Sequence, residues 1–251
     1  GLRWQQPVVG ARPVRCWFPA LLAAGCTGGG GADDIASTEP AGDGLGVDVL
    51  DAPFATGEGF GDPELAVNGV RGAGTSAGST DVYSISHDPD DHLVLGFGGA
   101  RLLDGEGIDL VVFENAFDIT SGGRFMDPAV VEVSPDGERW TAFPHGFDGT
   151  ELTDADAWWG FAGLQPVEVH DDERPMDHDD PAAGGDRFDL ADLDGDDPVA
   201  REVWSDGAVA VRISSAASWT DPATGEGFQP QPTANGPDID GVYAAWLRPA
   251  D

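Results

Sequence analysis

The sequence predicts an all-β protein, and three observations support this prediction. Glycine and proline are abundant, with 37 and 19 of 251 residues. Few segments carry apolar residues at helical spacing for more than two turns, whereas short β-branched or aromatic runs recur between glycine-rich turns. With 40% hydrophobic residues, the chain is long enough to bury a normal core. Because residues 47–251 contain no repeat and no break in composition, we expect one jelly-roll β-sandwich domain there.

The stretch 105–140 is expected to form the centre of this domain. The apolar run Ile108–Phe113 is interrupted only by Asp109 and follows two glycines, which predicts a central strand. A second strand over Ala129–Val133 leads into Ser134–Gly137, a Ser-Pro-Asp-Gly turn in which proline presets φ and glycine can adopt positive φ. The chain then returns, so the stretch predicts a β-meander.

Four further strands are expected around this meander. Each is a short run of alternating or β-branched apolar residues bounded by acidic or glycine-rich turns. They are residues 82–85, 93–97, 209–213 and 239–246.

Residues 1–26 differ from the rest of the chain. Three arginines precede the apolar segment Cys16–Gly25, and the sequence Leu-Ala-Ala-Gly before Cys26 resembles a bacterial lipobox. Ten apolar residues cover only about half of a ~30 Å hydrocarbon core, which argues against a membrane span. We therefore expect a lipoprotein signal peptide over 1–26, lipidation at Cys26, and a flexible acidic glycine-rich tether over 27–46. The alternative is an N-terminal segment without a signal function.

The charge is strongly negative. Forty-six acidic residues oppose 12 basic ones, for a net charge of −34, and lysine is absent. Such a surface repels phosphate backbones, so we expect no nucleic-acid partner and cations as counter-ions. The alternative is that the acids only maintain solubility.

Clustered acids suggest a calcium site. Calcium requires six to eight hard oxygen ligands, and the run 186–197 is rich in aspartate without matching an EF-hand. We expect an extended C-terminal strand to direct two more aspartates to one face. The predicted calcium ligands are Asp186, Asp189, Asp192, Asp238 and Asp240, with Glu114 or Asn115. The alternative is that these aspartates cap backbone amides in solvated turns.

Aromatic residues suggest a ligand site. Trp158 and Trp159 predict a platform on which a sugar ring stacks, and the nearby Asp154 and Asp156 are expected to accept hydrogen bonds from its hydroxyl groups. Packing of the tryptophans in the core is the alternative. A further alternative is zinc bound by His145, His170 and His178 with a carboxylate, since no cysteine thiolate is near.

Several motifs resemble those of a known group of proteins. They are 109–115 (DLVVFEN), 128–137 (PAVVEVSPDG), 183–192 (AGGDRFDLAD) and 237–242 (PDIDGV). Together they resemble uncharacterised bacterial cell-surface proteins and lipoproteins, and residues 131–140 are similar to a strand-turn-strand of discoidin-like, galactose-binding-like jelly rolls. The resemblance implies an extracellular β-sandwich with bound calcium and no established catalytic residues.

We expect no nucleophilic enzyme, because both cysteines lie in the predicted signal segment and the one G-x-S-x-G match, 74–78, lies in a glycine-rich loop and not between a strand and a helix. We therefore predict a non-enzymatic, surface-anchored and calcium-stabilised module that binds carbohydrate or another extracellular polymer, outside the cytoplasm on the bacterial cell envelope. One alternative is a non-catalytic structural protein of the cell envelope. The second is a glycoside hydrolase that uses two carboxylates.

Overall fold

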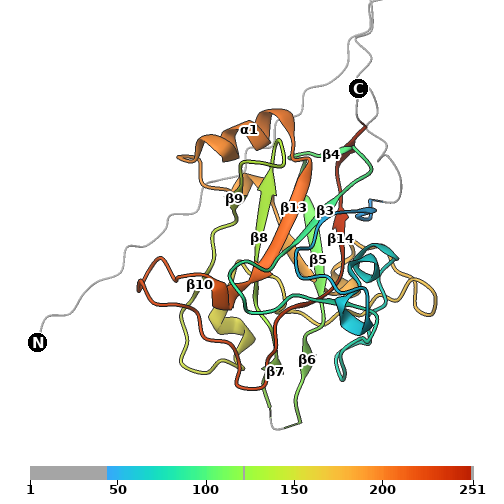
Figure 1. Cartoon of the computed structure of the whole chain (residues 1–251), viewed down its shortest axis with the longest axis vertical. Coiled ribbons are helices and arrows are strands. Elements are labelled where there is room, and N and C mark those ends of the chain that lie inside the picture. Colours follow the sequence, from blue (N-terminus) through green and yellow to red (C-terminus); the bar gives the residue numbers. More distant parts are fainter. Residues whose placement is uncertain (1–43, 121, 250–251) are drawn as a thin grey trace, which may run out of the picture. The chain divides into compact units, whose positions relative to one another are not determined.

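A computed structural model of the chain describes residues 44–120 and 122–249. These residues belong to one compact unit and are mostly β, with α1 (Pro198–Asp206) as the single α-helix among them (Figure 1). Among the described residues, no helix combines the length and the hydropathy of a membrane-spanning segment. The predictions for the signal peptide, for Cys26 and for most of the tether lie outside the described residues.

The larger sheet has five antiparallel strands. Their order is β1 (Asp48–Asp51), β3 (Leu93–Gly96), β13 (Ala210–Ser215), β8 (Ala129–Ser134) and β9 (Thr141–Ala142). Strand β13 is central and pairs with β3 on one side and β8 on the other.

The second sheet has four antiparallel strands. Their order is β12 (Asp186–Phe188), β5 (Leu110–Glu114), β14 (Asp238–Ala244) and β2 (Tyr83–Ser84). The register between β14 and β5 shifts between Ile239 and Gly241, which makes Asp240 the extra residue of a β-bulge.

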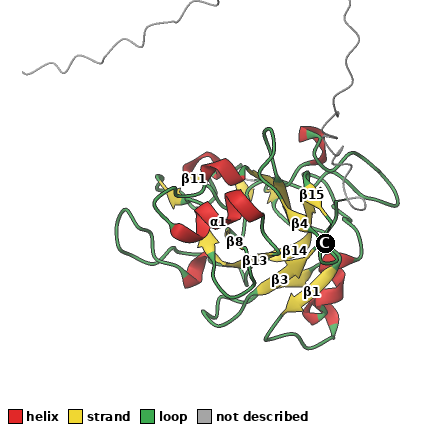
Figure 2. Ribbon diagram, turned by 90° about the horizontal axis from the view of Figure 1, so that it is seen from above, coloured by secondary structure: helices red, strands yellow, loops and turns green. Residues whose placement is uncertain are grey.

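Three two-stranded ribbons and several short 3₁₀ helices complete the described part. The ribbons are β10 (Gly146–Phe147) with β11 (Trp158–Trp159), β4 (Arg101–Leu102) with β15 (Leu247–Arg248), and β6 (Phe117–Asp118) with β7 (Arg124–Phe125). The 3₁₀ helices are η1 (Gly59–Gly61), η2 (Pro63–Val67), η3 (Ala155–Ala157), η4 (Pro181–Ala183), η5 (Leu190–Asp192) and η6 (Ala216–Ser218). The helical segments lie around the strands (Figure 2).

The two larger sheets share one hydrophobic core, and β5 is buried on both faces. Leu110 and Val112 of β5 pack in the cluster that also contains alternate residues of β3, β8, β13 and β14. Val111 and Phe113 point the other way, into a second cluster formed with loop residues. Burial on both faces explains why this strand is almost continuously apolar.

Most expected strands coincide with observed ones within a few residues. The expected central strand corresponds to β5, and the next one corresponds to β8. In the turn after β8, Gly137 has φ of 81° and its N–H donates to the Ser134 hydroxyl at 2.7 Å. The expected tight reversal after β8 is therefore confirmed. The expected β-meander is wrong, because β5 and β8 belong to different sheets and only β8 and β9 pair as neighbours.

Helix α1 was not expected. Asp197 caps its N-terminus by accepting a hydrogen bond from the Val199 N–H at 2.8 Å, and Pro198 occupies the first position. Only Ala200 and Val203 are buried, so the apolar face is too narrow to show clear helical spacing. The acidic run before this helix includes its cap.

Candidate functional site

The predicted calcium ligands lie at both ends of β5, and the strand is too long for one ion to contact both ends. Asp109 precedes this strand and Glu114 ends it. At about 3.3 Å of rise per residue, the two positions lie about 16 Å apart. Antiparallel pairing places Phe188 opposite Leu110, so Asp189 lies at the Asp109 end. The predicted ligands therefore form more than one group, and one ion cannot bind them all.

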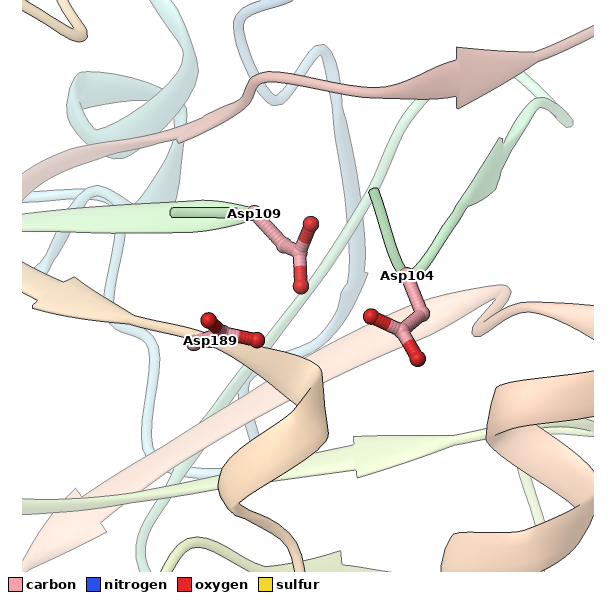
Figure 3. Close-up of side chains that lie close together, drawn as sticks. All are labelled: Asp104, Asp109 and Asp189. Atoms are coloured by element: carbon pink, nitrogen blue, oxygen red, sulfur yellow. The ribbon is translucent and has the colours of Figure 1, made fainter. Parts of the chain in front are cut away.

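A compact acidic triad lies at the Asp109 end. One carboxylate oxygen each of Asp104, Asp109 and Asp189 lies within 4.8 Å of the others (Figure 3). It is the one group of three potential metal ligands found among the described residues. Asp189 belongs to the predicted set, whereas Asp104 and Asp109 do not.

Backbone hydrogen bonds hold two of the triad carboxylates. The two oxygens of Asp109 accept from the N–H groups of Gly105 at 2.8 Å and Leu190 at 2.7 Å. Asp189 accepts from the Ala191 N–H at 2.9 Å and caps η5. Each carboxylate oxygen has a second lone pair, so these turns position the triad while leaving sites for a cation.

Electrostatics in the triad favour neutralisation. Burial raises the pKa of Asp109 to about 6, although two backbone hydrogen bonds act in the opposite direction, and the charges of Asp189 and Asp104 raise it further. Burial and the charge of Asp189 also raise the pKa of Asp104. A hard divalent cation would relieve this repulsion, and carboxylate oxygens are the ligands that calcium prefers.

A second acidic group lies at the other end of β5, around Glu114. This side chain is 2% exposed, its Oε1 accepts from the Asp238 N–H at 3.2 Å, and its Oε2 has no partner. Burial raises the pKa of Glu114 well above its ordinary value, and the charges of Asp127, Asp238 and Asp186 add to the effect. Burial also raises the pKa of Asp127 to about 7.

The other members of this second group already have partners. Asp186 accepts from the N–H groups of Leu164 at 2.9 Å and Gln165 at 3.3 Å, and burial raises its pKa to about 7. The Asn115 side chain binds both polar backbone groups of Ser79. Within the described residues these acids do not bring three ligand atoms within 4.8 Å. Glu114, Asp186 and Asp238 thus share a region without forming a closed cation site.

Two predicted calcium ligands lie elsewhere. Asp240 accepts from the Arg71 N–H at 2.9 and 3.0 Å, and burial raises its pKa to about 7. The bulge at Asp240 breaks the alternation along β14, so Asp238 and Asp240 do not share a site. Asp192 is exposed at the end of η5.

The remaining aspartates of the run 186–197 support the alternative interpretation. Asp194 accepts from the Asp196 N–H at 2.9 Å, and Asp197 caps α1. These side chains satisfy backbone amides in turns and helix starts.

The two tryptophans of β11 face opposite sides, as alternate residues of a strand do. Trp158 is 4% exposed and packs on Phe147 and Phe161 at ring-centroid distances of 4.4 and 5.4 Å. The prediction that Trp158 contacts a ligand is therefore wrong, because it is a core residue. Trp159 is 47% exposed, and its indole lies beside Gly146 of β10.

Trp159 borders a groove of about 390 Å³. The groove combines aromatic walls with one basic and one acidic side chain. Its other lining residues are Phe143, Pro144, Gly160, Arg187, Phe188 and Asp192.

Asp154 and Asp156 lie in a different cavity, of about 710 Å³, which Asp118, Arg124 and Gln165 also line. Asp154 caps η3 by accepting from the Asp156 N–H at 3.2 Å. The structure therefore does not place the two acids in the Trp159 groove.

The histidines form no zinc site in the described residues. His145 hydrogen bonds to the Phe143 carbonyl at 2.7 Å and packs against Phe161. His178 Nε2 lies 2.9 Å from Asp171. None of the three histidines belongs to a group of potential metal ligands in this part of the chain.

Three functional candidates were missed by sequence reasoning: Asp104, Asp109 and Asp127. Asp104 immediately precedes Gly105, in the turn that leads into β5, and Asp127 stands two residues before β8. An acidic residue directly next to a predicted buried strand could have been identified as a candidate site residue, because the strand brings it to the edge of the core.

Comparisons with protein-family models, with curated proteins and with solved structures found no match to this chain. The conclusions about function therefore rest on the geometry described above.

Proposed function

We propose that this chain is a jelly-roll binding module that takes carbohydrate in the Trp159 groove and is stabilised by calcium at Asp104, Asp109 and Asp189. Anchoring to the bacterial cell surface through Cys26 is part of the proposal. The observation that carries it is the exposed indole of Trp159, which borders a groove containing charged hydrogen-bonding groups.

The order of the strands supports a jelly roll. Along the chain, β2, β5, β12 and β14 belong to the four-stranded sheet, and β3, β8, β9 and β13 belong to the other. When these eight strands are renumbered 1 to 8 in chain order, the strand order is 1-8-3-6 in the four-stranded sheet and 2-7-4-5 in the other. Strand β1 is an additional edge strand of the second of these sheets. Two Greek keys wrapped into a pair of sheets have this order.

The shape of the groove supports a sugar ligand. Aromatic faces combined with a few polar groups are typical of small-ligand sites, and 390 Å³ falls in their usual range of about 300–1,000 Å³. The exposed Asp192 offers acceptors to hydroxyl groups. The net charge of −34 favours neutral over acidic glycans.

The triad supports a weak calcium site. Three carboxylates supply half or fewer of the six to eight oxygens that calcium takes, so water would complete the shell. A Kd on the order of 10⁻⁴ to 10⁻³ M, as in other extracellular modules, is expected.

A glycan array with neutral and acidic sugars, probed in calcium and in EDTA, tests the proposal. Binding to a class of neutral glycans is expected. Absence of any glycan signal, together with calcium-dependent stability, would point instead to a structural protein of the cell envelope. Turnover of a bound glycan would point to the hydrolase alternative.

A further inference from the structure

A small cavity lies where four distant segments meet. His87 comes from the connection between β2 and β3, Asp127 precedes β8, Trp158 is in β11, and Ser215 ends β13. The cavity has a volume of about 10 Å³. That volume is close to the minimum that one water molecule needs.

Three polar atoms of the residues that line this cavity are buried and have no hydrogen-bond partner. They are His87 Nε2, Asp127 Oδ1 and Trp158 Nε1. Asp127 and Trp158 are each 4% exposed. Because a buried polar group without a partner is costly, three such atoms on residues that line one cavity indicate a bound polar group.

The chemistry of the three atoms selects the occupant. The indole N–H of Trp158 can only donate, so the occupant must accept a hydrogen bond. The carboxylate of Asp127 accepts, so the occupant must also donate. A cation would be repelled by the indole N–H and an anion by the carboxylate, whereas water satisfies both.

His87 fits the same occupant. Its Nδ1 lies 2.8 Å from the Ser215 hydroxyl, which leaves Nε2 to donate to or accept from a water molecule. Ser215 also accepts from the Ala217 N–H at 3.2 Å and thereby caps η6. The ring of His87 is thus already oriented by a partner at the end of β13.

We propose that a single structural water molecule binds in this cavity, accepting from Trp158 Nε1 and bridging Asp127 Oδ1 and His87 Nε2. It joins β11 to the start of β8 and the end of β13. Trp158 points to the buried face of β11 and Trp159 to the exposed face. The water therefore contacts β11 on its buried face. The water site is independent of what Trp159 binds.

A high-resolution crystal structure of the protein tests this proposal directly. The expected result is one water within hydrogen-bonding distance of all three atoms. An empty cavity, an ion at this position, or a direct hydrogen bond between His87 and Asp127 would overturn the proposal.

A double-mutant cycle provides a second test in solution. Trp158→Phe removes the indole N–H, Asp127→Ala removes the acceptor, and both changes break the same water-mediated link. The losses in Tm are expected to be non-additive, each about 2–4 °C when made alone. Additive losses would overturn the proposal.

Trp246 offers a matched control for this cycle. Its Nε1 is also buried without a partner, but Trp246 does not line the cavity. Trp246→Phe should therefore add to Asp127→Ala without coupling. Equal coupling of both tryptophans to Asp127 would also overturn the proposal. If Trp158→Phe does not fold, the crystal structure of the unmodified protein decides.

Discussion

The carboxylate of Asp109 accepts a hydrogen bond of 2.7 Å from the backbone N–H of Leu190, 81 positions further along the chain. This bond ties the start of β5 to η5 and brings Asp189 beside Asp109. A cation bound by the triad would join the same two segments. Calcium and the fold are therefore expected to stabilise one another.

Asp109→Asn should reduce the stabilisation by calcium. A ligand that binds only the folded protein adds about 2.7 kcal/mol at 100 times its Kd, and the variant loses one of three charges that attract the ion. The measurement is Tm in calcium and in EDTA. The control Asp194→Asn alters an exposed turn aspartate outside the triad and should keep the full gain. An undiminished gain in Asp109→Asn would refute the assignment.

In EDTA, the protein should be more stable at pH 5 than at pH 8. Burial raises the pKa of Asp109 to about 6 and the pKa values of Asp127, Asp186 and Asp240 to about 7, from 3.8. Raised carboxyl pKa values favour the protonated, folded form. Their contribution is thus complete below about pH 4 and is lost as the pH rises through 6 to 7.

Urea unfolding at both pH values checks this dependence. A shift from 3.8 to about 7 corresponds to on the order of 4 kcal/mol for one buried group, so Asp240→Asn should flatten the curve. Asp136→Asn should leave the slope unchanged, because backbone hydrogen bonds from Arg139 and Glu138 lower the pKa of this carboxyl. Stability that increases from pH 5 to 8 in EDTA would contradict the account.

Gly146→Ala should weaken ligand binding without loss of the fold. An added Cβ would lie 2.5 Å from Trp159 Cζ2, so the indole must move. Loss of one aromatic contact lowers the affinity by about 2- to 10-fold. The control is Gly227→Ala, whose Cβ would approach no atom closer than 3.7 Å. Array signals that are equal for both variants would show that the position of Trp159 is unimportant.

Arg212→Lys should destabilise the five-stranded sheet although it keeps the charge. Arg212 makes two hydrogen bonds of 2.6 Å to the buried Glu132 and lies 4.4 Å above the Trp140 ring. Lysine cannot form this fork or stack in the same way, so a loss of about 1–3 kcal/mol is expected in urea unfolding.

Arg139→Lys is the matched control. Arg139 makes a similar fork to Glu202, with bonds of 2.7 and 2.8 Å, but at an exposed surface. Exposed pairs contribute little, so the loss should remain below about 1 kcal/mol. Equal losses for the two variants would show that burial of Glu132 does not matter.

Local sequence patterns were sufficient to predict the strands and the turn after β8. The β-branched run of β5 and the Ser-Pro-Asp-Gly turn after β8 depend on nearby residues alone. Helix α1 was not predicted because only Ala200 and Val203 are buried on it, so the sequence shows no clear helical spacing of apolar residues. Its cap, Asp197, was counted among the clustered acids.

The sequence alone could not predict which acids lie together, because this depends on contacts between segments that are far apart in the chain. A bulge of one residue at Asp240 and the length of β5 decide which carboxylates meet, and neither can be read from the acidic positions. For Trp158 and Trp159 the signal was present, because neighbouring residues of a strand face opposite sides. That alternation predicts that only one of them is exposed.

The central claim, that the exposed face of Trp159 binds carbohydrate, is tested most directly by a glycan array with Trp159→Ala beside Phe60→Ala. Phe60 is 50% exposed, lies in η1 and does not line the groove, so it controls for the loss of an exposed aromatic ring. Trp159→Ala should abolish the signal of the unmodified protein, whereas Phe60→Ala should retain it. An unchanged signal from Trp159→Ala would contradict the account.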